Sequence, residues 1–274
     1  MHTAVRVSLA LTAAMALAAP SHAQQDSANA GRTFHWSGPV ASGHWIRVRN
    51  LSGAIRVEQG TSNDVVVDAE KRGDRGDPAR IRFVMTKTGA DNGDVLICAL
   101  WDNESSCDVE GSHTHSHHSH WDDDDDNDHL SVRFTVKLPA GVNVAVSTVN
   151  GQVSVDGATA QVEARTVNGS VEASTSGGPV SASTVNGDVE VHMANTGHAT
   201  DLEYSTVNGS VTVTLPTKLD ADVDLSTVNG SVQSDYPLTL EGRIDPKHLH
   251  GTIGNGGLRL RARTVNGQIE LRKT

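Results

Sequence analysis

The segment NVAVSTVNGQVSV, residues 143–155, contains the tetrapeptide that decides the fold. Thr-Val-Asn-Gly begins at positions 148, 166, 184, 206, 227 and 264, so successive copies start 18, 18, 22, 21 and 37 residues apart. The tetrapeptide contains no catalytic acid or base and no strong metal ligand. A spacing near 20 residues is typical of a stacked repeat array. The repeat is therefore expected to have a primarily structural role.

Apolar residues alternate with polar ones on both sides of each copy. In the first unit Val144 and Val146 precede the tetrapeptide at alternate positions. Val149, Val153 and Val155 follow with the parity shifted by one residue. Alternation with a period of two indicates a strand with one buried face, and a shift of parity is typical of a corner or bulge. Each unit is predicted to be a strand, a corner and a second strand.

Asn and Gly are expected to form each corner because both tolerate positive φ at low cost. The predicted corner residues are Asn150, Gly151, Asn168, Gly169, Asn186, Gly187, Asn208, Gly209, Asn229, Gly230, Asn266 and Gly267. Taken alone, Asn-Gly between alternating apolar residues also indicates a two-residue hairpin. Units that recur every 18–22 residues can stack residue on residue, so the predicted fold is all-β, a β-solenoid (β-helix-like) of strand-corner-strand repeats. An antiparallel β meander is the alternative.

A seventh, degenerate copy lies at residues 46–57, where Leu51, Ser52 and Gly53 keep the parity shift and the glycine but lose the asparagine. Candidate strands without the repeat follow at residues 65–69, 81–88, 94–99 and 130–138. They are candidates to cap or extend the stack, because the open end of a solenoid is an unpaired edge. The stretch GTIGNGG, residues 251–257, is a candidate cap for the other end.

These motifs carry a resemblance to a known family. LPAGVNVAVSTVNGQVSV from Leu138, the serial STVNG units and GTIGNGGLRLRARTVNGQIEL from Gly251 resemble the bacterial putative-adhesin β-strand-repeat family. Its members are exported proteins grouped under a domain of unknown function. The resemblance covers about residues 34–271 and implies a β-solenoid-like envelope or secreted protein, with adhesion implied by the family name. The His/Asp-rich insertion described below is not counted as part of that pattern.

The amino-terminal sequence predicts export. Arg6 precedes an apolar run, and a small-x-small cleavage pattern ends at Ala23, so residues 1–23 are expected to be a signal peptide. The remaining chain is divided into a β region at 24–140, which holds the degenerate repeat and the insertion, and a continuous repeat solenoid at 141–274. Loss of Arg6 moves the formal charge from -11 to -12, which argues against nucleic acid as a partner. No stretch has the length of a transmembrane helix.

The chain has two cysteines, Cys98 and Cys107. In an oxidising compartment they are expected to form one disulfide that closes a small loop. A thiolate metal site is the alternative.

Residues 108–129 form the chemically distinctive segment, with the sequence DVEGSHTHSHHSHWDDDDDNDH. Neutral imidazole binds Zn, Ni or Cu, and neighbouring carboxylates can complete such a site. The candidate metal ligands are His113, His115, His117, His118, His120, Asp122, Asp124, Asp126 and His129. A solvated loop of low complexity, in a protein that requires no cofactor, is the preferred interpretation, and binding of Zn, Ni or Cu is the alternative.

No catalytic constellation is visible in the sequence. Glu172, Asp188 and Glu190 are predicted to face outward and could form an acidic patch, but such patches are more often solvated surface than acid/base pairs. The preferred function is a non-enzymatic, exported structural or adhesive module of the cell envelope or periplasm, with a cell-surface polysaccharide or an envelope protein as partner. Metal binding by the insertion is the alternative, and a glycan-acting β-helix enzyme is a remote one.

Overall fold

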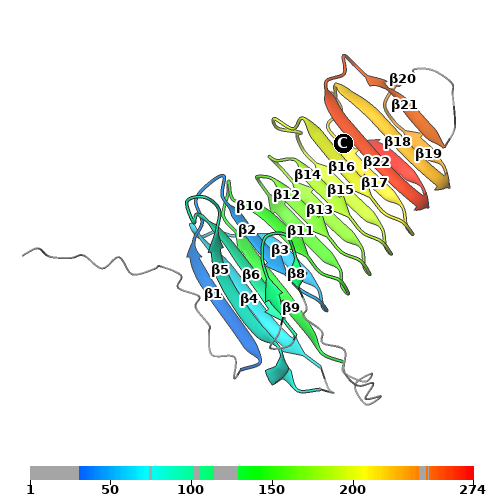
Figure 1. The fold of residues 1–274 in the computed structure, drawn as a ribbon. Coiled ribbons are helices and arrows are strands. Elements are labelled where there is room, and N and C mark those ends of the chain that lie inside the picture. The colour runs from blue at the N-terminus through cyan, green and yellow to red at the C-terminus, as the bar shows by residue number, and fades with distance from the viewer. Residues whose placement is uncertain (1–30, 74–75, 102–104, 114–128, 241–244, 246) are drawn as a thin grey trace, which may run out of the picture.

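The computed structural model describes residues 31–73, 76–101, 105–113, 129–240, 245 and 247–274. Across these residues the chain forms two large β-sheets that face each other along an elongated stack (Figure 1). The described part contains one short 3-10 helix, Pro78–Arg80, and no α-helix. The predicted all-β solenoid is confirmed.

Sheet A contains ten strands. In spatial order they are β1 (Thr33–Pro39), β4 (Asp64–Arg72), β9 (Ser131–Leu138), β3 (Ile55–Gln59), β11 (Val153–Ala158), β13 (Val171–Thr175), β15 (Val189–Met193), β17 (Val211–Leu215), β23 (Ile269–Lys273) and β19 (Val232–Ser234).

Sheet B contains eleven strands. In spatial order they are β20 (Thr239–Leu240), β21 (His248–Ile253), β18 (Ala221–Asn229), β22 (Leu258–Asn266), β16 (Asp201–Ser205), β14 (Val180–Ser183), β12 (Val162–Arg165), β10 (Asn143–Ser147), β2 (Trp45–Arg49), β6 (Asp94–Leu100) and β5 (Arg82–Thr88). A separate hairpin joins β7 (Ser106–Cys107) to β8 (Ser112–His113).

Each unit forms one rung, which consists of a sheet B strand, a corner and a sheet A strand. Neighbouring rungs pair in parallel and in register, so that Val153 pairs with Val171, and Val171 with Val189. The degenerate copy forms the rung of β2 and β3, which pairs in parallel with β10 and β11. Parallel pairing between units excludes both the antiparallel meander and the local hairpin interpretation of Asn-Gly.

The last repeat in the sequence is not the last rung in space. β22 lies between β16 and β18 (Figure 1). In the other sheet, β23 pairs with β17 on one side and with β19 on the other. The chain therefore passes over one rung position, forms the unit of β18 and β19, and returns to fill the position it left. The order of the units in the stack therefore differs from their order in the sequence.

Charge explains why β22 suits the position between β16 and β18. Asp201 and Asp222 both pair with Arg259, whereas Glu203 and Asp224 both pair with Arg261. Direct pairing of β16 with β18 in the same register would set carboxylates opposite carboxylates, which is unfavourable across strands. The arginines of β22 separate the two acidic rows.

Antiparallel strands close both ends of the stack. At the amino-terminal end β4 pairs with β9 and β1, and β5 pairs with β6. At the other end β21 pairs with β18, and β20 pairs with β21. The candidate strands at 65–69, 81–88, 94–99 and 130–138 lie in β4, β5, β6 and β9, and part of GTIGNGG lies in β21.

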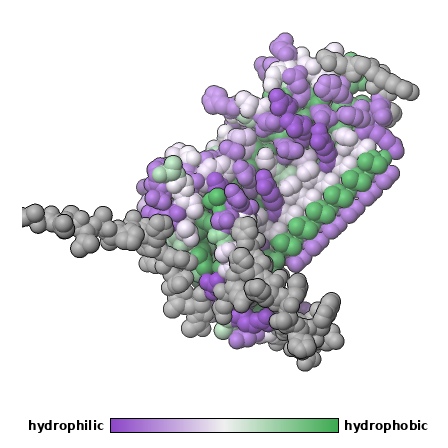
Figure 2. Space-filling model, viewed as in Figure 1, coloured by the Kyte–Doolittle hydropathy of each residue, from purple (hydrophilic) through white to green (hydrophobic). Residues whose placement is uncertain are grey.

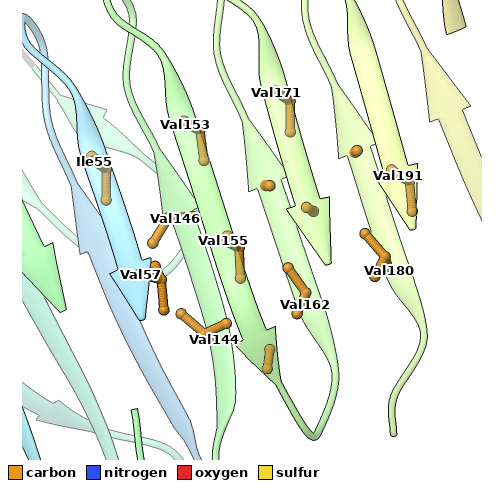
Figure 3. Close-up of a cluster of buried hydrophobic side chains, with 14 of the residues drawn as sticks. Ile55, Val57, Val144, Val146, Val153, Val155, Val162, Val171, Val180 and Val191 are labelled. Atoms are coloured by element: carbon orange, nitrogen blue, oxygen red, sulfur yellow. The ribbon is translucent and has the colours of Figure 1, made fainter. Parts of the chain in front are cut away.

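The core is thin and consists mainly of stacked valines between the two sheets (Figure 3). Val144 and Val162 come from sheet B, and Val153 and Val171 from sheet A, each with no exposed surface. A valine row suits this space because the same side chain recurs in neighbouring rungs, about 4.8 Å apart. The chain's three phenylalanines instead cluster under the amino-terminal cap, where the repeat is absent: Phe34, Phe83 and Phe134.

Candidate functional site

The corners of the rungs lie one above another and form a continuous edge, here called the corner edge, from Ser52 to the Thr-Val-Asn-Gly copy at 227. Its outermost element is a ladder of asparagine amides. Asn168 Nδ2 donates to Asn150 Oδ1 at 2.8 Å, and Asn186 Nδ2 donates to Asn168 Oδ1 at 2.8 Å. The ladder continues through Asn208, Asn266 and Asn229, in the spatial order of the rungs.

Inside the asparagine ladder lies a row of buried threonines. Each threonine hydroxyl donates to the carbonyl of the corner glycine in the preceding rung, as Thr184 Oγ1 does to Gly169 O at 2.8 Å. Thr166 and Thr206 make the same bond to Gly151 and Gly187. A buried carbonyl needs a donor, and the threonine supplies one at every rung.

The corner glycines are required by close packing between rungs. A Cβ on Gly169 would collide with the carbonyl of Gly151, and a Cβ on Gly187 with that of Gly169. The predicted use of asparagine for positive φ is wrong, because Asn92, outside the repeats, is the one described non-glycine residue with positive φ. Asparagine is instead placed so that its amide bonds the next rung.

The valine of each corner points outward, although alternation suggested that it continued the buried face. Val167, Val185 and Val207 are 37, 38 and 39% exposed, and Val228 is 55% exposed. The chain turns over Val-Asn-Gly, so the inward series ends at the threonine and resumes after the glycine. Figure 2 shows the result as an apolar stripe beside a polar one, running along the stack. The row comprises Leu51, Val149, Val167, Val185, Val207, Val265 and Val228.

The degenerate copy reproduces the corner with other residues. Asn50 occupies the threonine position and is buried, and its Nδ2 donates to Val132 O at 2.8 Å. Ser52 occupies the asparagine position and pairs through its backbone with Asn150. The threonine's role is thus taken by an amide, which the sequence pattern alone did not reveal.

The predicted disulfide between Cys98 and Cys107 is confirmed. Cys98 lies on the outer face of β6 in a small cluster with Val84, Leu96 and Leu100. β6 and β9 belong to one rung, since they pair with β2 and β3 respectively. Residues 101–130 connect these two strands, so the insertion stands where a corner tetrapeptide would otherwise stand.

Most of the predicted metal ligands lie outside the described residues, namely His115, His117, His118, His120, Asp122, Asp124 and Asp126. His113 is in β8, and His129 is exposed just before β9. Among the residues that the structure describes, no group of three or more His, Cys, Asp or Glu side chains is placed to hold a metal ion. Metal binding by the insertion stays a prediction.

The acidic residues considered for catalysis divide between two places. Glu172 and Glu190 lie opposite each other on β13 and β15, in a shallow hollow that Arg56 and His192 also line. Asp188 lies nearer the corner edge, where its Oδ1 accepts a hydrogen bond from the Ser210 N–H at 2.8 Å. The three carboxylates therefore do not converge on one point.

The geometry above defines a β-solenoid repeat protein with a regular, exposed corner edge. The chain belongs to the Toastrack DUF4097 family, whose model matches residues 45–272. The comparison with curated proteins gave no match. In the described residues, no helix has the length and apolar character needed to cross a membrane.

Three solved structures are similar to this chain. A putative cell adhesion protein from Clostridium sporogenes is 10% identical, with 88% of this chain and 100% of that chain covered and a TM-score of 0.41. A putative adhesin from Bacteroides fragilis is 11% identical, with 89% and 98% covered and a TM-score of 0.34. A putative adhesin from Parabacteroides distasonis is 11% identical, with the same coverage and a TM-score of 0.22.

Proposed function

We propose that this protein is a non-enzymatic, exported adhesive or structural module that binds a repetitive polysaccharide of the cell envelope along the corner edge. The observation that carries the proposal is the outward-facing apolar row from Leu51 to Val228, in which Val149 is half-buried and the other members are at least 37% exposed. Contiguous exposed apolar surface on a soluble protein usually marks an interaction site. A row repeated about every 4.8 Å suits a ligand that is itself a regular polymer.

The chemistry of the edge fits a saccharide. Apolar methyl groups contact the hydrophobic faces of sugar rings, and the adjacent amide ladder can donate to and accept from hydroxyl groups. The edge is held by hydrogen bonds between rungs, such as that from Asn208 Nδ2 to Asn186 Oδ1 at 2.7 Å. Binding therefore needs little ordering of side chains, which favours affinity.

The test compares two triple variants in co-sedimentation with purified envelope polysaccharides. Replacing Val167, Val185 and Val207 by Thr keeps the β-branched shape and removes the apolar row, so binding should fall about tenfold or more. Replacing the same residues by Ile keeps the row and should preserve binding. Equal binding by both variants, or retention of an envelope protein in place of glycan, would contradict the proposal.

Export is tested separately. Residues 1–23 carry the pattern of a signal peptide, so protein recovered from the periplasm or medium should begin at Gln24. Mass spectrometry of the intact protein measures this directly, and a chain that retains Met1 in the cytoplasmic fraction would count against export.

Metal binding by the insertion is the second candidate, favoured by six histidines and six aspartates within residues 113–129. Calorimetric titration with Zn, Ni and Cu should give stoichiometric binding that is lost when residues 113–129 are deleted. Weak, non-saturating binding would leave this segment without a metal role.

A further inference from the structure

A cationic hollow lies on the outer face of sheet B, next to the amino-terminal part of the corner edge. Its volume is about 260 Å³, and its floor is made by the small residues Ala145 and Ser147 of β10. Arg47 and Arg49 of β2 rise on one side, and Arg165 of β12 on the other. Small residues in the middle strand leave space between two rows of long side chains.

The hairpin of β7 and β8 forms the remaining wall. The disulfide ties Cys107 to β6, and Arg49 donates through Nη2 to the carbonyl of Val109. Val109 and Glu110 line the hollow at this side. The hollow therefore depends on residues more than 100 positions apart in the chain, which the disulfide and the parallel rungs bring together.

Positive charge exceeds negative charge among the lining residues. Three arginines face two glutamates, Glu110 and Glu163, in a protein whose formal net charge is -11. Burial lowers the pKa of Arg49, and the charges of Arg47 and Arg165 also lower it, against the opposite effect of the Asp108 and Glu163 carboxylates. Accumulating like charges in a half-buried place is unfavourable unless an anion offsets them.

Two of the donors in this cluster lack acceptors. Arg47 Nε and Arg49 Nε are both buried, and neither has a hydrogen-bond partner within the part of the chain that the structure describes. Arg47 is otherwise held over the Trp45 ring at 4.6 Å, with its Nη2 3.7 Å from Asp94 Oδ2. A buried donor without an acceptor costs about 1–3 kcal/mol, so the two guanidinium groups are incompletely satisfied by the protein.

We propose that this hollow binds an oxyanion group, a carboxylate, sulfate or phosphate, and the choice of an acidic saccharide as its carrier rests on the proposed function. Such groups accept two hydrogen bonds from one guanidinium and satisfy several donors at once. The volume lies below the range of about 300–1,000 Å³ that encloses a drug-sized ligand, so it suits one charged group and leaves the rest of the saccharide outside. The site is distinct from the valine row and stands whether or not that row is adhesive.

The experiment titrates the full chain with D-galacturonate, inorganic phosphate and inorganic sulfate at low ionic strength, by calorimetry. Saturable binding by at least one probe is expected, and it should weaken as salt is added. Preference for galacturonate would identify a carboxylate as the group that the hollow recognises, and preference for an inorganic ion would identify a phosphate or sulfate group. Failure of all three probes to saturate would overturn the proposal.

Three variants test the assignment to these residues. Arg165→Gln should weaken binding about tenfold without loss of folding, because this side chain is 66% exposed. Arg49→Lys keeps the charge but loses the guanidinium fork, and it should also weaken binding. Glu163→Gln should strengthen binding, since Glu163 competes for Arg165 from 4.0 Å.

The matched control is Arg259→Gln, the same loss of charge on a 63% exposed arginine near the other end of sheet B. It should leave the affinity unchanged. If it weakens binding as much as Arg165→Gln does, the effect is one of overall charge and the hollow is not the site. If Glu163→Gln and Arg165→Gln shift affinity in the same direction, the assignment is also wrong.

Discussion

At the scale of single residues, each position of the tetrapeptide has a separate task. The threonine satisfies a buried carbonyl, the valine covers the outer edge, the asparagine bonds the neighbouring amide and the glycine admits the adjacent backbone. Thr184, Val185, Asn186 and Gly187 illustrate all four in one rung. Because these tasks concern contacts between rungs, the cost of a substitution should depend on how many neighbouring rungs it affects.

The asparagine ladder provides a graded test of this idea. Asn186 donates to Asn168 and accepts from Asn208, whereas Asn229 at the ladder's end donates to Asn266. Asn186→Ala should lower the free energy of unfolding by about 1–2 kcal/mol, and Asn229→Ala by about half as much. Urea denaturation measures both. An equal loss for the two variants would show that the ladder bonds contribute little.

At the buried threonine position, the hydroxyl group should contribute more to stability than the shape of the side chain does. Thr184→Val retains the shape but leaves the Gly169 carbonyl without the donor that bonds it at 2.8 Å, so we expect a loss of about 1–3 kcal/mol. Thr184→Ser keeps the hydroxyl and should cost less, despite the missing methyl group. Thermal unfolding followed by circular dichroism compares the two, and greater stability of the valine variant would contradict the assigned role.

At the scale of elements, charge determines the place of β22. Arg261 lies 3.2 Å from Asp201 of β16, and Arg263 lies 3.0 Å from Asp224 of β18. Single exposed pairs contribute about 0–1 kcal/mol. Their larger effect is on specificity, because direct pairing of β16 with β18 in this register would set Asp201 opposite Asp222 and Glu203 opposite Asp224.

This arrangement predicts a dependence of stability on pH. Burial alone would raise the pKa of Asp224, but hydrogen bonds from Arg263 and His248 bring it below 3.8. A carboxylate with a lowered pKa in the folded state stabilises the fold above its unfolded pKa and ceases to do so as pH falls. Wild-type protein should therefore lose more stability than Asp224→Asn between about pH 5 and pH 3. Urea midpoints across this range provide the measurement, and parallel curves would refute the expectation.

At the scale of the whole molecule, the carboxy-terminal segment is an internal part of the stack. β22 and β23 pair with strands on both sides, so residues 258–273 hold the final rung and its cap to the array. Terminal segments are usually the least ordered part of a domain, yet this one supports everything beyond β17.

Removal of this segment should therefore separate the stack into a stable and an unstable part. A chain that ends at Gly257 should keep the rungs up to β17 but expose residues 218–257 to protease, because β18 and β19 lose their parallel neighbours. Limited proteolysis with mass spectrometry locates the cleavage sites. Adding a peptide of residues 258–274 should restore protection. A truncated chain as resistant as the full one would disprove the structural role.

The sequence by itself determined the strands and the corner positions, and it favoured the stacking of parallel units and the disulfide over their alternatives. These follow from alternation with a period of two, from the recurring Asn-Gly and from two cysteines in a chain with a predicted export signal, which are all properties of short segments. The candidate site could be predicted only in part from such local sequence patterns. Alternation assigned Val167 and its equivalents to the buried series, because it cannot show where the chain turns.

Only the tertiary structure decided the order of the rungs and the residues that meet across them. Every rung presents the same hydrogen-bonding edge to its neighbour. The local sequence pattern therefore cannot show whether the units stack in sequence order or whether a later unit inserts between two earlier ones. The choice depends on charges about 20–60 residues apart, such as Asp201, Asp222 and Arg259, which become neighbours when β22 enters. The arginine hollow has the same origin, since Arg49, Val109 and Arg165 meet only when parallel rungs and a disulfide bring distant segments together.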